Sequence, residues 1–276
     1  MNMKRKFFNY VTDIVIKMFR LNTATKFLCS FLEKIDPVYV VENRGIKYFL
    51  SCPNDLVRWR AETYFTKEPE TIEWVDTFNP GDVLFDIGAN VGLYSIYAAK
   101  KGIDVVSFEP ESQNFALLNK NIYLNKCSNK VTCLNVAISD QNLCDYLYLP
   151  QFQAGGAINC FGSPLDEQGK FFAPVFNQGV MSYTLDFFLL QSKFFPTHIK
   201  IDVDGIEPKV INGAENTLKD PRLKSLSIEL NDELLEHLEV VKKIQLMGFT
   251  FKHKKHSVLV DFGKDFKIFN YVFTRT

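Results

Sequence analysis

The chain has 276 residues, of which 46% are hydrophobic and 23% are charged, a composition typical of folded globular proteins. Its 32 Lys and Arg residues balance 32 Asp and Glu residues, so its formal net charge at pH 7 is zero. Proteins that bind nucleic acid over a broad surface need an excess of cations, so this balance argues against that class and predicts no nucleic-acid partner. The length fits one large domain or two small ones.

The six cysteines contain no C-x-x-C pair, which argues against a zinc site or a redox motif. A reducing compartment is the simpler interpretation, so we expect a cytoplasmic protein. Asp13, Lys17 and Arg20 interrupt the apolar residues near the start of the sequence. We therefore expect neither a signal peptide nor a membrane span.

Basic residues are concentrated at the start of the sequence. Residues 1–35 hold seven Lys or Arg and two Asp or Glu, an excess of five positive charges, and the remainder has an equal negative excess. Polar residues recur there at helical spacing opposite apolar ones, which predicts a basic amphipathic helix. Such a helix could bind a partner or, through residues 1–30, the inner surface of a membrane, or it could pack on the main domain. We predict an N-terminal helical extension and lead-in over residues 1–65 and a catalytic domain over 66–276.

From about residue 66 the pattern alternates between strands and helices. The predicted strands are 82–87, 104–109, 131–138, 145–149, 198–203, 226–230, 249–252 and 271–274, with a further one around 258–261; the predicted helices are 93–100, 112–124, 208–218 and 232–247. Repeated strand and helix units predict a doubly wound α/β sheet with helices on both faces. The stretch 150–180, rich in Gly, Gln, Phe and Pro, is expected to be irregular and to cover a ligand site.

A glycine turn follows the first strand of this pattern. In an open α/β sheet, ligands bind at the carboxyl ends of the strands where the strand order reverses. Gly88 allows a tight turn there, and Gly92 lets the next helix come close, although the spacing departs from G-x-G-x-x-G. Glu109 ends the second strand and could accept hydrogen bonds from both hydroxyls of a ribose. Glycine turn and acid together indicate a cofactor that contains a nucleoside. Asp140, after the third strand, could bind an adenine amino group or simply be a turn residue.

Carboxylates also follow the fourth and fifth strands. Because strand side chains alternate, Lys200, Asp202 and Asp204 would point to one side if the strand continued that far. Asp202 would lie at the strand end beside a bound ligand, and Asp204 could accept a proton or hold a divalent cation. The alternative is a Lys–Asp pair that fixes the loop before Gly205. Glu229 is the next candidate base.

Several ordered motifs together resemble the FkbM family of S-adenosylmethionine-dependent methyltransferases over about residues 66–250. They are 86–92 (DIGANVG), 108–110 (FEP), 137–140 (AISD), 183–186 (YTLD), 200–208 (KIDVDGIEP) and 227–230 (SIEL). The resemblance implies a seven-stranded, Rossmann-like class I methyltransferase sheet whose last strand is antiparallel. It also implies a cofactor loop of Asp86, Gly88, Asn90 and Gly92, and a ribose held by Glu109. Where the family usually has Glu in the fourth-strand motif, this sequence has the shorter Asp204.

Three functions remain open on this evidence. The first is an S-adenosylmethionine-dependent transfer of a methyl group to a hydroxyl oxygen of a small molecule or glycan, with a carboxylate base. The second is a nicotinamide-dependent oxidoreductase on a similar sheet. The third is an adaptor that binds the cofactor without turnover and acts through its basic helix.

Overall fold

The computed structural model describes residues 6–7, 9–11, 13–14, 17, 25, 29–31, 34–166, 168–255 and 267–275. Two compact units are distinguished, Met1–Val38 and Tyr39–Thr276. In the first unit, the described residues between 6 and 34 are helical. The rest of the predicted amphipathic helix, including Lys4, Arg5 and Arg20, and the predicted strand at 258–261 lie outside the described residues. Among the helices that the structure describes, none is long and apolar enough to cross a bilayer.

The second unit begins with a hairpin and two short helices. Strands β1 (Val38–Asn43) and β2 (Ile46–Ser51) pair, followed by α3 (Asp55–Glu62) and α4 (Pro69–Asp76). The amide groups of Asn121 and Asn125 fasten β2 to the main body, because they accept the backbone N–H groups of Ser51 and Phe49 at 2.8 and 3.0 Å. Residues 39–65 thus belong to the same compact unit as the sheet that follows. The limits 1–65 and 66–276 as domain boundaries stay a prediction.

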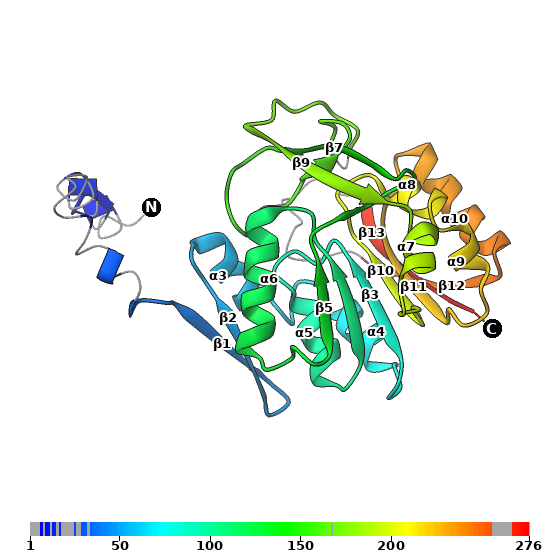
Figure 1. The fold of residues 1–276 in the computed structure, drawn as a ribbon, viewed down its shortest axis with the longest axis horizontal. Coiled ribbons are helices and arrows are strands. Elements are labelled where there is room, and N and C mark those ends of the chain that lie inside the picture. Colours follow the sequence, from blue (N-terminus) through cyan, green and yellow to red (C-terminus); the bar gives the residue numbers. More distant parts are fainter. Residues whose placement is uncertain are drawn as a thin grey trace. The chain divides into compact units, whose positions relative to one another are not determined.

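The unit is built on a seven-stranded sheet (Figure 1). Its strands, in spatial order, are β12 (Phe249–Lys255), β13 (Ile268–Arg275), β11 (Ser225–Asn231), β10 (His198–Ile201), β3 (Val83–Ile87), β4 (Asp104–Phe108) and β5 (Val131–Leu134). Strand β13 is antiparallel to both neighbours, whereas β11, β10, β3, β4 and β5 run parallel. This order confirms the predicted doubly wound sheet and its antiparallel last strand.

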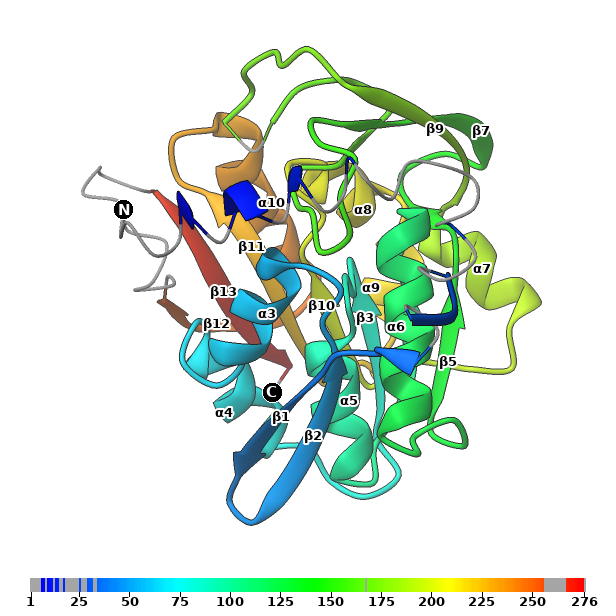
Figure 2. The same ribbon diagram turned by 90° about the vertical axis from the view of Figure 1, so that its left-hand side faces the viewer.

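Helices cover both faces of the sheet because its strands are apolar on both sides. The helices are α5 (Leu93–Lys100), α6 (Ser112–Leu124), α7 (Leu185–Gln191), α8 (Glu207–Asn212), α9 (Glu215–Lys219) and α10 (Leu235–Leu246). Leu84 packs in one core with α4, α5 and α6, and its neighbour Phe85 packs in the other with α8, α9 and α10. Figure 2 shows α4, α5 and α6 on the near side of the sheet.

A second, four-stranded sheet differs from the sequence prediction. It contains β6 (Ala137–Ile138), β9 (Phe176–Tyr183), β7 (Leu143–Leu149) and β8 (Cys160–Phe161), in that order. The predicted strand 131–138 is therefore divided between two sheets, and the stretch 150–180 contains β8 and most of β9. Leu147, Leu149, Phe161 and Val180 form a small core of their own. Because its pairing partners are far apart in the sequence, local periodicity does not indicate this sheet.

The predicted helix 208–218 is also divided. It forms α8 and α9, with Gly213 between them. A Cβ atom at Gly213 would lie 2.1 Å from the carbonyl oxygen of Ser139. The break thus lets the backbone approach the end of β6 closely.

Candidate active site

A cavity of about 380 Å³ opens at the carboxyl ends of β3, β4, β10 and β11. Strands β3 and β10 are neighbours in the sheet, and the chain proceeds from them in opposite directions, so this is where strand order reverses. The volume lies in the range of small-molecule sites. The wall includes the β3–α5 turn, the end of β4, residues 156–159 and residues 202–204.

Gly88 brings two loops into contact at the wall of the cavity. Its φ is +84°, and a Cβ atom there would lie 1.8 Å from the carbonyl oxygen of Asp202. The N–H groups of Gly88 and Ala89 donate to the carbonyl of Phe108 at 2.9 and 3.0 Å. Only glycine allows this approach of the β3 and β10 loops. Gly92 instead packs towards α6, since a Cβ there would lie 2.5 Å from Cδ1 of Leu118.

Glu109 is a buried carboxylate on the cavity wall. It is 5% exposed, and its two oxygens accept the backbone N–H groups of Asn90 at 2.7 Å and Glu111 at 2.9 Å. Within the described residues no cation pairs with it, and burial, with Glu111 and Asp204 nearby, raises its pKa to about 8. Hydroxyl donors entering the cavity would stabilise this carboxylate, so the environment fits the predicted contact with a ribose.

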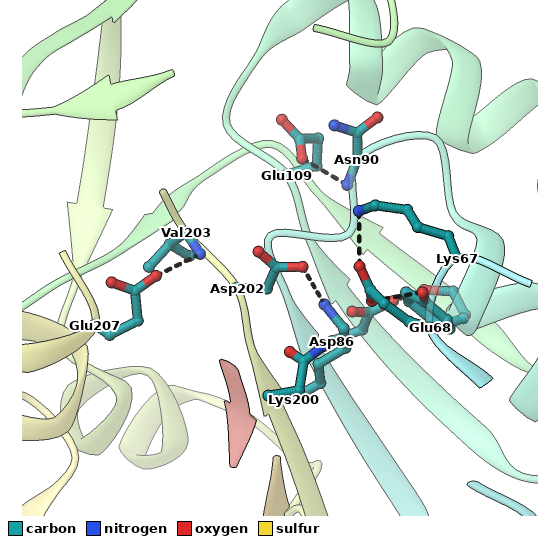
Figure 3. Close-up of polar contacts among 12 residues, drawn as sticks. Lys67, Glu68, Asp86, Asn90, Glu109, Lys200, Asp202, Val203 and Glu207 are labelled. Atoms are coloured by element: carbon teal, nitrogen blue, oxygen red, sulfur yellow. Dashed lines mark hydrogen bonds and ion pairs between the residues drawn. The ribbon is translucent and has the colours of Figure 1, made fainter. Parts of the chain in front are cut away.

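Side-chain amides hold the loop 154–159 beside this part of the cavity. Figure 3 shows one of them, Asn90, next to Glu109. Asn90 donates to the carbonyl of Gly156 at 2.9 Å, and Asn114 donates to the same oxygen at 3.1 Å. Asn114 also accepts the N–H of Gly155 at 2.7 Å. Part of the stretch 150–180 thus lines the cavity, and the stretch also contains strands that were not predicted.

Lys200 and Asp202 form an ion pair at the end of β10. The Lys200 Nζ lies 2.7 Å from Asp202 Oδ2, and the exposed fractions of the two side chains are 3% and 25%. Burial raises the pKa of Asp202, but Lys200 and Lys67 outweigh it and hold the pKa below the ordinary value. Asp202 is paired with Lys200 and also lines the cavity. Its geometry is therefore compatible with a structural ion pair and with a role in the site, and both stay predictions.

Asp204 lines the cavity, but not as part of a strand. Strand β10 ends at Ile201, and Asp204 has a left-handed φ of +58°. Its Oδ2 accepts the N–H groups of Ile158 at 2.8 Å and Asn159 at 3.3 Å. Burial and the neighbouring Asp202 raise its pKa to about 6, against the effect of those N–H donors. Asp204 is therefore ionised at neutral pH and is the more basic of the two carboxylates.

Glu229 also lines the cavity, at the end of β11. Burial, together with Asp202 and Glu68, raises its pKa well above the ordinary value. A raised pKa makes Glu229 a stronger proton acceptor when it is ionised, and its predicted role as a base stays a prediction.

Three predicted cofactor residues, Asp86, Gly92 and Asp140, lie outside the cavity wall. Asp86 is 1% exposed and accepts a hydrogen bond from Ser95 at 2.5 Å, and its Oδ1 has no partner among the described residues. Asp140 is half-buried after β6, where Ser139 donates to it at 3.2 Å. None of the three belongs to the lining, so their cofactor contacts stay predictions.

Sequence reasoning missed Lys67, Glu68 and Tyr94, which all line the cavity. Lys67 pairs with Glu68 at 2.7 Å, and the hydroxyl of Tyr94 donates to Glu68 at 2.6 Å. The sequence contains one signal for this position: Pro69 is of a type common at the first residue of a helix, so Glu68 could have been placed at a helix start. In the part of the chain that the structure describes, no group of three or more His, Cys, Asp or Glu residues could hold a metal ion.

The sheet order, the glycine turn and the acid after the next strand define a class I methyltransferase fold. The chain belongs to the FkbM methyltransferase family, because residues 86–251, more than half of the sequence, match the family described as "Methyltransferase FkbM domain". This confirms the resemblance found in the motifs.

Individual relatives match shorter segments. The 31-O-demethyl-FK506 methyltransferase FkbM of Streptomyces tacrolimicus is 38% identical over 64 residues, which is 22% of this chain and 24% of the relative. A tRNA (guanine(37)-N(1))-methyltransferase of Candida albicans (strain WO-1) is 33% identical over 112 residues, 39% of this chain and 24% of the relative. The matches thus span about a quarter of these curated relatives. The solved precorrin-6y C5,15-methyltransferase of Geobacter metallireducens GS-15 is 14% identical, with a TM-score of 0.44 over 82% of this chain and 95% of that one.

The prediction of no nucleic-acid partner is wrong. Besides the Candida protein, four other tRNA (guanine(37)-N(1))-methyltransferases are 32% to 44% identical to segments of this chain. The prediction rested on net charge, which describes the whole surface. A nucleic acid can bind to a local surface beside a cavity even when the net charge of the protein is zero.

Proposed function

We propose that the protein is an S-adenosylmethionine-dependent methyltransferase that transfers the methyl group to a hydroxyl oxygen of a small molecule or glycan. One observation carries the proposal: a single cavity is lined by the acidic side chains of Glu109, Asp202 and Asp204. Membership of a methyltransferase family supports this function over a nicotinamide-dependent oxidoreductase. The FkbM relative, whose name specifies a 31-O-demethyl substrate, supports oxygen as the acceptor atom.

The residues on the cavity wall fit S-adenosylmethionine. Glu109 would accept hydrogen bonds from the ribose hydroxyls, and the apolar side chains of Ile138, Leu147 and Phe161 would contact the adenine. When bound, this cofactor supplies a methyl group on a positively charged sulfur. The protein then has to orient the acceptor, exclude water and take up the hydroxyl proton.

We assign the uptake of the hydroxyl proton to Asp204. Its Oδ2 is occupied by two backbone N–H groups, and among the described hydrogen bonds its Oδ1 accepts none. A pKa of about 6 leaves it ionised at neutral pH yet more basic than an ordinary Asp. Asp202 is a weaker proton acceptor because Lys200 stabilises its ionised form.

Calorimetric titration with S-adenosylhomocysteine tests the cofactor assignment. We expect the wild-type protein to bind it at pH 8 or above, where Glu109 is at least half ionised, and Glu109→Gln to weaken binding there about tenfold or more through loss of a charge-assisted hydrogen bond. Glu73→Gln is the matched control, because Glu73 is an exposed residue of α4 that pairs with Lys255. Binding of NAD instead of S-adenosylhomocysteine would favour the oxidoreductase, and equal affinity of Glu109→Gln and wild type would remove the ribose contact.

A second candidate acceptor is a guanine ring nitrogen of an RNA. The five tRNA (guanine(37)-N(1))-methyltransferases that match this chain favour it. Such an acceptor nitrogen also loses a proton, so Asp204 would serve the same purpose. Methyl-labelled S-adenosylmethionine incubated with tRNA, and separately with a small-molecule extract, would distinguish the two. Label in tRNA alone would replace the hydroxyl proposal.

A further inference from the structure

Two ion pairs lie on the cavity wall. The more buried member is the anion in one pair and the cation in the other. Lys67 Nζ is 2.7 Å from Glu68 Oε1, and Lys200 Nζ is 2.7 Å from Asp202 Oδ2. All four residues line the cavity, and Figure 3 shows them grouped below Asn90 and Glu109. In each pair one member is buried and the other is accessible. The buried members, Glu68 and Lys200, are each 3% exposed, whereas Lys67 is 26% and Asp202 is 25% exposed.

The accessible members therefore have opposite charges. Lys67 presents an ammonium group to the cavity, and Asp202 presents a carboxylate. They also interact with each other, because Asp202 and Glu68 outweigh the effect of burial and raise the pKa of Lys67. A ligand group that complements this surface carries one positive and one negative charge close together, as the α-amino-carboxylate of an amino acid does.

Glu68 makes its hydrogen bonds on the cavity side and not with its own helix. It occupies the N-cap position of α4, yet its side chain makes no capping hydrogen bond. Its second oxygen accepts the hydroxyl of Tyr94 at 2.6 Å instead. Glu111, at the N-cap of α6, has the usual arrangement and accepts the N–H groups of Gln113 and Asn114. In α4 the Glu68 carboxylate is instead occupied by Lys67 and Tyr94, which line the cavity.

We infer that Lys67 and Asp202 bind the amino-acid end of S-adenosylmethionine, Lys67 contacting its carboxylate and Asp202 its ammonium group. Glu68 and Lys200 are positioning residues that hold these two side chains in place. The inference rests on the proposed function, since S-adenosylmethionine is the ligand that would bring a zwitterion to this cavity. It also extends the cofactor site upstream of residues 86–251, the part of the chain that matches the family.

The test compares two ligands that differ in this end. S-adenosylhomocysteine carries the α-amino-carboxylate, and 5′-methylthioadenosine keeps the nucleoside and the sulfur without it. We expect Lys67→Met to weaken S-adenosylhomocysteine binding about tenfold to a hundredfold while leaving 5′-methylthioadenosine within about twofold. Lys67→Met keeps an unbranched apolar stem and affects the less buried member of its pair, so it is expected to fold. Lys255→Met, at a half-exposed pair outside the cavity lining, is the matched control.

A second variant examines the other charge. Asp202→Asn should weaken binding of decarboxylated S-adenosylmethionine, which retains the ammonium group, whereas Lys67→Met should not. An equal loss for both nucleosides in Lys67→Met, or no loss for either, would overturn the inference. Failure of the wild-type protein to bind S-adenosylhomocysteine at all would instead reject the proposed function.

Discussion

Asp202 and Asp204 are two residues apart, and their surroundings give them different chemistry. Lys200 neutralises Asp202 at 2.7 Å, which lowers its pKa despite burial. No described salt bridge involves Asp204, whose Oδ2 accepts backbone N–H groups, and burial and the charge of Asp202 raise its pKa to about 6. Two identical side chains on one loop can thus serve as a binding anion and as a base.

The activity of the wild-type protein should therefore rise with pH through about 6. The base must be deprotonated to accept a proton, and the ionised fraction of Asp204 increases as pH rises past its pKa. In Asp204→Asn we expect this acidic limb to disappear and turnover to fall by about 10² to 10⁴. The measurement is the rate of methyl transfer between pH 5 and 8 on the acceptor that the labelling experiment identifies.

Asp104→Asn is the control for this substitution. Asp104 pairs with Lys130 at the amino end of β4, away from the carboxyl ends that form the cavity. A rate profile of Asp204→Asn that keeps the limb near pH 6 would assign the titrating group to another residue.

At the scale of elements, the loop 154–159 connects parts of the unit that are far apart in the sequence. Asn54 before α3 donates to the carbonyl of Ala154 at 2.9 Å, and Arg60 of α3 donates to that of Gly155 at 2.7 Å. Asn114 of α6 and Asp204 after β10 hold the following residues. Helix α3, which precedes the family match, thus contributes to the position of a cavity wall.

Asn114→Ala should loosen this loop. Asn114 is 1% exposed and makes two hydrogen bonds with the loop backbone, at Gly155 and Gly156. Their loss leaves buried backbone groups without these partners, which costs about 1 to 3 kcal/mol. We expect faster amide hydrogen exchange over 154–159 and weaker S-adenosylhomocysteine binding. Asn119→Ala is the control on the same helix, because exposed Asn119 donates only to Phe115 within α6. Unchanged exchange in Asn114→Ala would show that other contacts hold the loop.

At the scale of the whole molecule, the site affects folding stability. Burial raises the pKa of both Glu109 and Glu207 to about 8. A raised pKa means that the folded state binds the proton more tightly than the unfolded state does. The stabilising contribution is present below the ordinary pKa of about 4.5 and is lost as pH rises towards 8.

Glu109→Gln should therefore gain stability relative to the wild type as pH increases in the absence of cofactor. A neutral amide at this position has no proton to lose, so the difference in the free energy of unfolding should shift in favour of the variant. We expect a shift of a few kcal/mol between pH 5 and 8, measured by urea denaturation. Glu73→Gln should show a constant difference from the wild type. Parallel curves for Glu109→Gln and wild type would contradict the effect of burial on Glu109.

Much of the fold and part of the site could be predicted from local patterns. Short apolar strands that alternate with helices predicted the doubly wound sheet, since each strand buries both faces. Gly88 and Glu109 could be identified because both follow strands whose ends must meet at one edge of the sheet. Asp86 was placed in the cofactor loop by the family resemblance alone; its side chain accepts a hydrogen bond from Ser95, and it is not among the residues that line the cavity.

Other features depend on contacts between distant segments. Lys67 and Glu68 come from a helix start before the sheet, and Asn270 reaches the cavity from the antiparallel β13. The small sheet of β6, β7, β8 and β9 pairs residues that no local period connects.

The sequence by itself determined the parallel core of the sheet, the glycine turn and the acid after the second strand, because periodicity and backbone freedom are local properties. The tertiary structure decided which carboxylates are ionised, which are protonated and which line the cavity. The physical reason is that protonation depends on burial and on neighbouring charges, and both come from segments brought together only by folding.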